Sequence, residues 1–145
     1  MVVASENAKF GLPESLRGIF ANAGGLPRLV RNVGMPIASE VAMAGRTLSA
    51  AEALQYQLIN KISSSPSTLI EEAVALAGKV ADISPDAIVV TRAGLRETWE
   101  NGSVERGASL VDERYSLALM AGENTKEGLA AFAEKRKPRW VPSKL

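Results

Sequence analysis

Residues 10–34 read FGLPESLRGIFANAGGLPRLVRNVG, and this stretch is the most informative part of the sequence for fold and function. It places one carboxylate, Glu14, directly after an apolar segment and a proline, and a glycine-rich loop follows. Glycines such as Gly18 and Gly24 let backbone approach a ligand closely. A helix that begins near Gly25 would present unpaired N–H groups to a carbonyl or to water. The stretch therefore predicts a candidate site around Glu14.

The surroundings of Glu14 favour acid/base chemistry. Apolar neighbours can desolvate a carboxyl group, which is a condition for proton transfer near pH 7. The neighbours expected to do so are Phe10, Leu12, Leu16, Ile19 and Phe20. The alternative is that Glu14 only caps the segment 15–20.

Composition narrows the possible chemistry. The chain has 145 residues, 17 basic and 16 acidic, with no cysteine and no histidine. The absent cysteines exclude disulfides and thiol nucleophiles, and the absent histidines exclude an imidazole base. Acid/base groups must then be Asp, Glu, Lys or Tyr. The near-neutral charge and 5% aromatic content argue against a nucleic-acid partner. The sequence contains no apolar run of about 18 residues, so it predicts no membrane-spanning helix.

The remaining chain is predicted to be mainly helical. Two short strands are expected at 2–5 and 9–11, and a third at 58–62. Helix boundaries are marked by caps, prolines and glycines. Helices are expected to end at Gly34, to start at Pro36, after Ser49, at Thr68 and at Asn124, and to span 84–101 and 103–121.

Several details of these helices are also predicted. Ser49 with Glu52, and Thr68 with Glu71, match capping boxes. The last helix is expected to bury Leu129 and Phe132. The apolar face of the helix from Thr68 is predicted to consist of Ile70, Ala73, Val74, Ala77, Val80 and Ala81. Because nothing earlier can pair with the opening strands, the chain reads as the later part of a larger domain.

Three segments together resemble a known family. They are FGLPE…AGGLPRLVRNVG, AMAGRTLSAAEALQYQLINKI and KEGLAAFAEKRKP, and in this order they are similar to the later half of the enoyl-CoA hydratase/isomerase (crotonase) superfamily. The resemblance implies an α/β fold, the ββα spiral, of which this chain holds a mostly helical C-terminal portion with few strands. It implies a partial spiral core over 1–66 and a helical region for trimerisation and CoA contact over 67–145.

The resemblance also implies an activity. Glu14 matches the family's catalytic acid/base in hydration of 2-enoyl-CoA thioesters during fatty-acid β-oxidation. No metal and no cofactor is implied, since CoA is part of the substrate. The family's oxyanion-hole N–H groups and second glutamate belong to an earlier segment, so the chain alone is expected to be weakly active or inactive. The alternatives are an enoyl-CoA isomerase, and a non-catalytic truncated subunit that assembles with full-length homologues.

Substrate-binding positions follow from the same resemblance. Pro13, Gly18 and Asn22 match substrate-binding positions of the family. Asn22 stands where the family usually has glycine, at a position near the water and the acyl chain in hydratases. Phe132 and Lys135 match positions that reach the adenine and ribose phosphate of CoA. The alternative for this basic segment is a solvated final turn whose cations suit the helix C-terminus.

The last three residues, Ser143, Lys144 and Leu145, match the C-terminal peroxisomal targeting signal Ser-Lys-Leu. They predict a peroxisomal import receptor as a partner and peroxisomal location, with a cytoplasmic location as the alternative. The resemblance implies a homo-trimer or hexamer for the full-length protein. The sequence leaves acyl-chain specificity open, and the choice between hydratase and isomerase as well.

Overall fold

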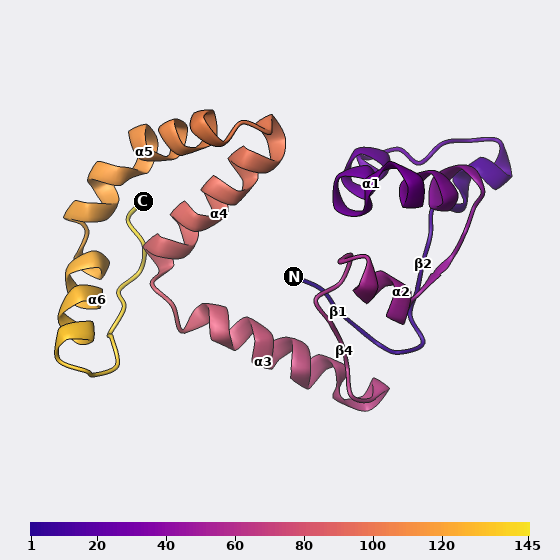
Figure 1. Ribbon diagram of the computed structural model, residues 1–145. Helices are drawn as coiled ribbons and strands as arrows, with labels where there is room; N and C mark the ends of the chain where they lie inside the picture. The colour runs from indigo at the N-terminus through magenta and orange to yellow at the C-terminus, as the bar shows by residue number, and fades with distance from the viewer. The chain divides into compact units, whose positions relative to one another are not determined.

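The computed structural model describes residues 1–145 (Figure 1). The chain forms two compact units, Met1–Leu76 and Ala77–Leu145. The division falls inside helix α3 (Leu69–Ala81), later in the chain than the expected boundary after residue 66.

The first unit holds four short strands. β1 (Val3–Ala4) pairs in parallel with β4 (Lys61–Ile62), and β2 (Lys9–Phe10) pairs antiparallel with β3 (Leu48–Ser49). The two expected opening strands are confirmed, and their partners come from later in the chain. The expected strand at 58–62 is confirmed only over its last two residues.

The core of the first unit is small. Ala4, Ala53 and Ile59 are buried together, and Phe10 and Leu58 pack against them with partial exposure. This packing holds β1, β2, β4 and helix α2 (Ala50–Gln55) together. The segment that follows β2 therefore starts from a fixed position.

Helix α1 (Gly25–Met43) confirms two sequence predictions in one element. It is broken at Gly34, whose φ of 76° and ψ of 167° are not helical. A glycine adopts such backbone angles without the steric cost that other residues meet. The helix resumes with Pro36 in its first turn, so the expected stop at Gly34 and restart at Pro36 are both present.

The first capping box is confirmed and the second is wrong. Ser49 Oγ accepts from Glu52 N at 3.3 Å, and Glu52 Oε2 accepts from Ser49 N at 2.8 Å. Thr68 instead closes a box with Ser65 around the 3₁₀ helix η2 (Pro66–Thr68). Its hydroxyl donates to Glu72 Oε1 at 2.7 Å, so a carboxylate one residue beyond the expected Glu71 takes the contact.

The second unit contains two helices that confirm their expected bounds. α4 (Pro85–Asn101) and α5 (Val104–Ala121) pack together (Figure 1). Gly107 permits a close approach, because a Cβ there would lie 3.0 Å from the Thr98 hydroxyl. Ser84 accepts from Ala87 N and caps α4 as predicted.

Helix α6 (Glu123–Ala133) departs from the prediction. Gly122 is its N-cap, so the expected start at Asn124 is wrong, and the Asn124 side chain lies buried instead. The expected burial of Leu129 and Phe132 is also wrong, because they are 65% and 86% exposed in this chain. The predicted apolar face of α3 is likewise largely uncovered, since Ile70 and Val74 are exposed.

Candidate functional site

Glu14 lies in a 3₁₀ helix, η1 (Pro13–Arg17), shortly after β2. Pro13 occupies the first position, where its fixed φ suits a helical turn. Gly18 ends the turn with a φ of 72°, and Ile19 N then donates to the Glu14 carbonyl at 3.2 Å. The predicted site residues Pro13, Glu14 and Gly18 therefore act as one local unit, in which the proline and the glycine fix the backbone of the glutamate.

The Glu14 carboxylate is unpaired. The side chain is half-buried, and its Oε2 is shielded from solvent without a hydrogen-bond partner. No side chain caps η1, so the alternative in which Glu14 only caps this segment finds no hydrogen bond to support it. A shielded, unsatisfied carboxylate oxygen is uncommon and suits a group that meets a ligand.

The expected source of this shielding is partly wrong. Leu16, Ile19 and Phe20 are all more than 60% exposed, so they do not enclose Glu14. Phe10 and Leu12 are half-buried. Leu16 lies on the exposed side of η1, and Ile19 and Phe20 lie in the irregular segment after it, so none of them forms an apolar cover.

The glycine-rich loop leads into α1 as predicted. Asn22 is exposed, and its Oδ1 accepts from Ala23 N at 2.8 Å. Ala23 and Gly24 both have positive φ, at 52° and 83°. Arg28 Nη1 donates to the Ala23 carbonyl at 3.1 Å and lies where a Cβ at Gly24 would stand. The Asn22 side chain is therefore engaged in shaping the loop.

A pocket of about 470 Å³ lies in the same unit, between β2 and α1. Its lining is mainly apolar, with three polar side chains from Lys9, Arg28 and Asn32. Its apolar side-chain lining comes from Val2, Phe10, Leu12, Leu29, Val41, Leu48 and Leu58. None of the predicted site residues lines it, so the structure does not bring Glu14 and Asn22 into this pocket.

Phe132 and Lys135 lie in the second unit, at and just after the end of α6. The Phe132 ring is 86% exposed, and Lys135 has a left-handed φ of 52°. Lys135 N donates to the Phe132 carbonyl at 3.3 Å, which closes the final turn. Both side chains are thus accessible to a ligand. Their CoA-binding role stays a prediction.

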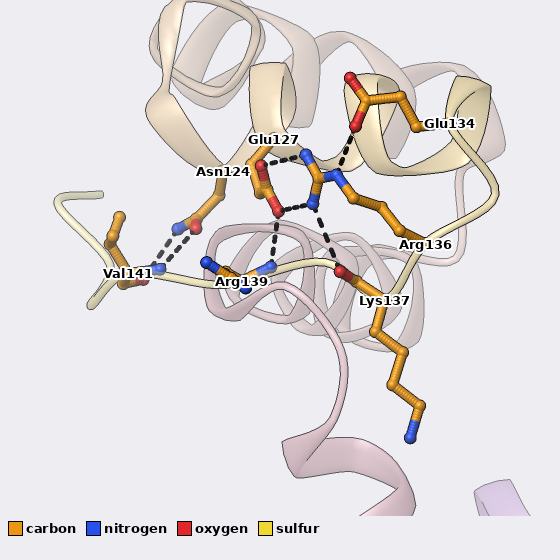
Figure 2. A network of polar contacts seen from close by, with 7 residues as sticks. All are labelled: Asn124, Glu127, Glu134, Arg136, Lys137, Arg139 and Val141. Atoms are coloured by element: carbon orange, nitrogen blue, oxygen red, sulfur yellow. Dashed lines mark hydrogen bonds and ion pairs between the residues drawn. The ribbon is translucent and has the colours of Figure 1, made fainter.

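A polar network that sequence reasoning missed follows this turn (Figure 2). Arg136 donates from Nη1 and Nη2 to the two oxygens of Glu127 at 2.6 and 2.9 Å, and from Nε to Glu134 at 2.5 Å. Arg139 N donates to Glu127 Oε1 at 2.6 Å. The Arg136 guanidinium and this N–H hold the pKa of Glu127 at about 2. The only sequence signal was the basic run itself.

Asn124 anchors the C-terminal segment. Its Oδ1 accepts from Val141 N at 2.9 Å, and its Nδ2 donates to Val141 O at 3.0 Å (Figure 2). The same Nδ2 also donates to Asp86 Oδ2 at 2.8 Å. The Ser143 hydroxyl and the Asn124 amide hold the pKa of Asp86 below its usual range. Residues far apart in sequence are therefore joined at one buried point.

The last three residues lie beside the start of α6. Lys144 Nζ forms an ion pair with Glu123 Oε1 at 2.6 Å, and both side chains are mainly exposed. Leu145 N donates to Ser143 Oγ at 3.2 Å. Lys144 and Leu145 are exposed, whereas Ser143 is half-buried. Peroxisomal import stays a prediction.

Two further properties bear on the site. The structure contains no group of three or more His, Cys, Asp or Glu residues that could hold a metal ion. None of its helices has both the length and the apolar character needed to cross a bilayer.

Comparison with known proteins identifies the family. Residues 1–143 match the family model described as enoyl-CoA hydratase/isomerase, and the chain therefore belongs to this family. It is 48% identical over its whole length to the mevalonyl-coenzyme A hydratase of Aspergillus fumigatus and covers 53% of that protein. It is 42% identical to the 2,3-dehydroadipyl-CoA hydratase of Escherichia coli, with 95% of this chain and 53% of that protein covered.

Solved structures agree with this assignment. An enoyl-CoA hydratase from Mycobacterium tuberculosis matches with a TM-score of 0.90 and 34% identity, over 99% of this chain and 56% of that one. The expected α/β, crotonase-like fold is thereby confirmed. The chain spans about half the length of the curated relatives it matches.

Proposed function

We propose that this chain supplies the catalytic glutamate of an enoyl-CoA hydratase, and that Glu14 is this residue. The observation that carries the proposal is the shielded, unpaired Glu14 Oε2, held by a proline and a left-handed glycine in a chain of the enoyl-CoA hydratase/isomerase family. A carboxyl group in this setting is able to exchange a proton with water.

The proposed reaction adds water across the 2,3 double bond of a 2-enoyl-CoA thioester. The water oxygen bonds to C3, one water proton passes to a carboxylate, and a carboxyl group delivers a proton to C2. Glu14 serves as one of these acid/base groups. Family resemblance assigns the second glutamate, and the two N–H groups that stabilise the thioester oxygen, to residues outside this chain.

The proposed substrate is a 2-enoyl-CoA, or the matching 3-hydroxyacyl-CoA in the reverse direction. Two of the relatives carry the names mevalonyl-coenzyme A hydratase and 2,3-dehydroadipyl-CoA hydratase. Both names describe acyl groups with a polar group at the end away from CoA. A role in fatty-acid β-oxidation would require an unsubstituted acyl chain instead. Comparing the rate of crotonyl-CoA hydration with the rate of mevalonyl-CoA dehydration decides between the two acyl classes.

We propose that residues at the end of α6 bind the CoA nucleotide and that residues around Glu14 bind the acyl group. Phe132 and Lys135 contact the adenine and ribose phosphate of CoA, and both are exposed as this requires. Pro13, Gly18 and Asn22 lie near the acyl group. The assembly proposed for the full-length protein is a homo-trimer or hexamer.

The experiment is a substitution in a hybrid protein that joins this chain to the portion of the A. fumigatus relative that it does not match. Glu14→Gln should lower kcat/KM about 10²–10⁴-fold, because it removes a general acid/base, while CoA affinity stays unchanged. Glu6→Gln, at an exposed turn, is the matched control. Turnover of E14Q within a few-fold of the parent would contradict the proposal. Product analysis separates hydration from double-bond isomerisation.

We also propose that Ser143-Lys144-Leu145 directs the protein to peroxisomes through the import receptor. A fluorescent protein fused ahead of this chain should collect in peroxisomes, and removal of the last three residues should leave it in the cytoplasm. A fusion that stays cytoplasmic with the tripeptide intact would contradict this localisation.

A further inference from the structure

One carboxylate, Glu127, organises the segment that follows α6. It accepts two hydrogen bonds from the Arg136 guanidinium, at 2.6 and 2.9 Å, and one from Arg139 N at 2.6 Å (Figure 2). The parallel fork between a guanidinium and a carboxylate is the ion-pair geometry with the strongest directional preference. Arg136 and Arg139, which lie 9 and 12 positions after Glu127, are thereby bound to one side chain of α6.

The network divides the basic segment into two groups of cations. Arg136 is neutralised within the protein by Glu127 and Glu134. Lys135, Lys137 and Arg139 take part in no ion pair through their side chains, and Arg139 joins the network only through its backbone. Figure 2 shows the Lys137 side chain extending away from the network. Lys135 and Lys137 are both exposed.

The backbone of this turn is constrained. Lys135 has a left-handed φ of 52°, a conformation that non-glycine residues adopt only when the surrounding structure holds them there. Arg136 N donates to the Ala131 carbonyl at 3.0 Å, next to the bond from Lys135 N to Phe132. The Glu127–Arg136 pair follows directly and fixes the residue after Lys135. The direction of the Lys135 side chain therefore depends on this pair.

We propose that Glu127 and Arg136 are positioning residues, which hold the turn so that Lys135 and Lys137 present two unpaired cations to a phosphate of the CoA nucleotide. The proposal rests on the proposed contact between CoA and the pair Phe132 and Lys135, and it extends that contact to Lys137. Glu127 stays ionised throughout the neutral range, because its pKa is held at about 2.

The test compares the affinity of the 145-residue chain for coenzyme A and for 3′-dephospho-coenzyme A by titration calorimetry. The ratio of the two affinities reports phosphate recognition, which a merely structural role would not change selectively. Glu127→Gln should lower the affinity for coenzyme A about three- to tenfold and leave that for the dephospho form unchanged. Arg136→Lys should change the two affinities in the same way as Glu127→Gln, because lysine lacks the planar guanidinium that pairs with both oxygens of Glu127.

The matched control is Glu134→Gln. Glu134 binds the same guanidinium but is more exposed than Glu127, with 61% against 23% side-chain exposure, and makes no bond to Arg139 N. It should leave both affinities unchanged. Helical ellipticity of each variant verifies that the second unit is folded.

The outcomes separate the two proposals. Lys135→Ala should bring the affinity ratio close to one. If it leaves the ratio unchanged, or if the parent chain does not bind coenzyme A, the proposed CoA contact is wrong and this inference falls with it. If Lys135→Ala acts as expected but E127Q matches E134Q, or if E127Q weakens both ligands equally, the positioning role alone is overturned.

Discussion

At the scale of single residues, the properties of the carboxylates depend on which hydrogen bonds each one accepts. Glu14 Oε2 is shielded and unpaired, whereas Glu72 is held by three groups, from β4, from the loop after it and from η2. The Lys61 ammonium, the Thr68 hydroxyl and Ser64 N–H hold the pKa of Glu72 at about 2. A carboxylate with this many partners stabilises the fold, and one without partners is available for chemistry.

Glu72 predicts a pH dependence of stability. Its folded pKa of about 2 lies below the ordinary value of 4.5, so its contribution is present above about pH 4.5 and is lost as pH falls towards 2. Glu72→Gln should lower the urea midpoint at pH 6, and the difference from the parent should shrink at pH 3. The neighbouring exposed Glu71→Gln is the control and should change little. An equal difference at both pH values would contradict this assignment.

At the scale of elements, local signals fix where helices begin and end. The Ser49 box starts α2 immediately after β3, so one residue serves both a strand and a helix cap. Gly34 and Gly102 stop helices with positive φ at the residues where the sequence predicts a stop. These signals act within four residues and therefore do not depend on distant packing.

Ser49→Ala tests the contribution of the cap. It should cost about 1 kcal/mol of unfolding free energy, because it removes the hydroxyl that pairs with Glu52 N. Urea denaturation followed by far-UV ellipticity measures this cost. Ser67→Ala is the control: Ser67 is exposed and its hydroxyl is hydrogen-bonded to Ser65 Oγ, so the change should stay below about 0.5 kcal/mol. Equal losses in both variants would show that the cap contributes nothing specific.

At the scale of the whole molecule, much apolar surface has no cover within this chain. Exposed large side chains occur in both units, and among them are Leu16, Phe20, Ile70, Leu95, Leu117, Leu129 and Phe132. This exposure agrees with the observation that the relatives are about twice as long.

The chain alone should show little or no hydratase turnover. The resemblance places the oxyanion-hole N–H groups outside this chain, and removal of one such donor alone costs about 10²–10³ in kcat. The hybrid with the unmatched portion of the A. fumigatus relative should restore activity. Robust hydration of crotonyl-CoA, or dehydration of mevalonyl-CoA, by the isolated 145 residues would refute this prediction.

The sequence by itself determined the family, through three segments along the chain. It also determined the two long helices at 84–101 and 103–121, the break at Gly34 and the position of Glu14 directly after a strand. These local features depend on neighbours a few residues away, which a linear pattern displays. The tertiary structure alone decided the partners of Asn124 and the pairing of Glu127 with Arg136 and Arg139 N. These partners lie 9 to 38 positions away. The local pattern around Asn124 predicts a helix start, because this pattern is the same for a cap and for a buried anchor. The burial of Leu129 and Phe132 was wrong for a related reason: periodicity predicts which face is apolar, but only the assembled chain shows whether anything covers it.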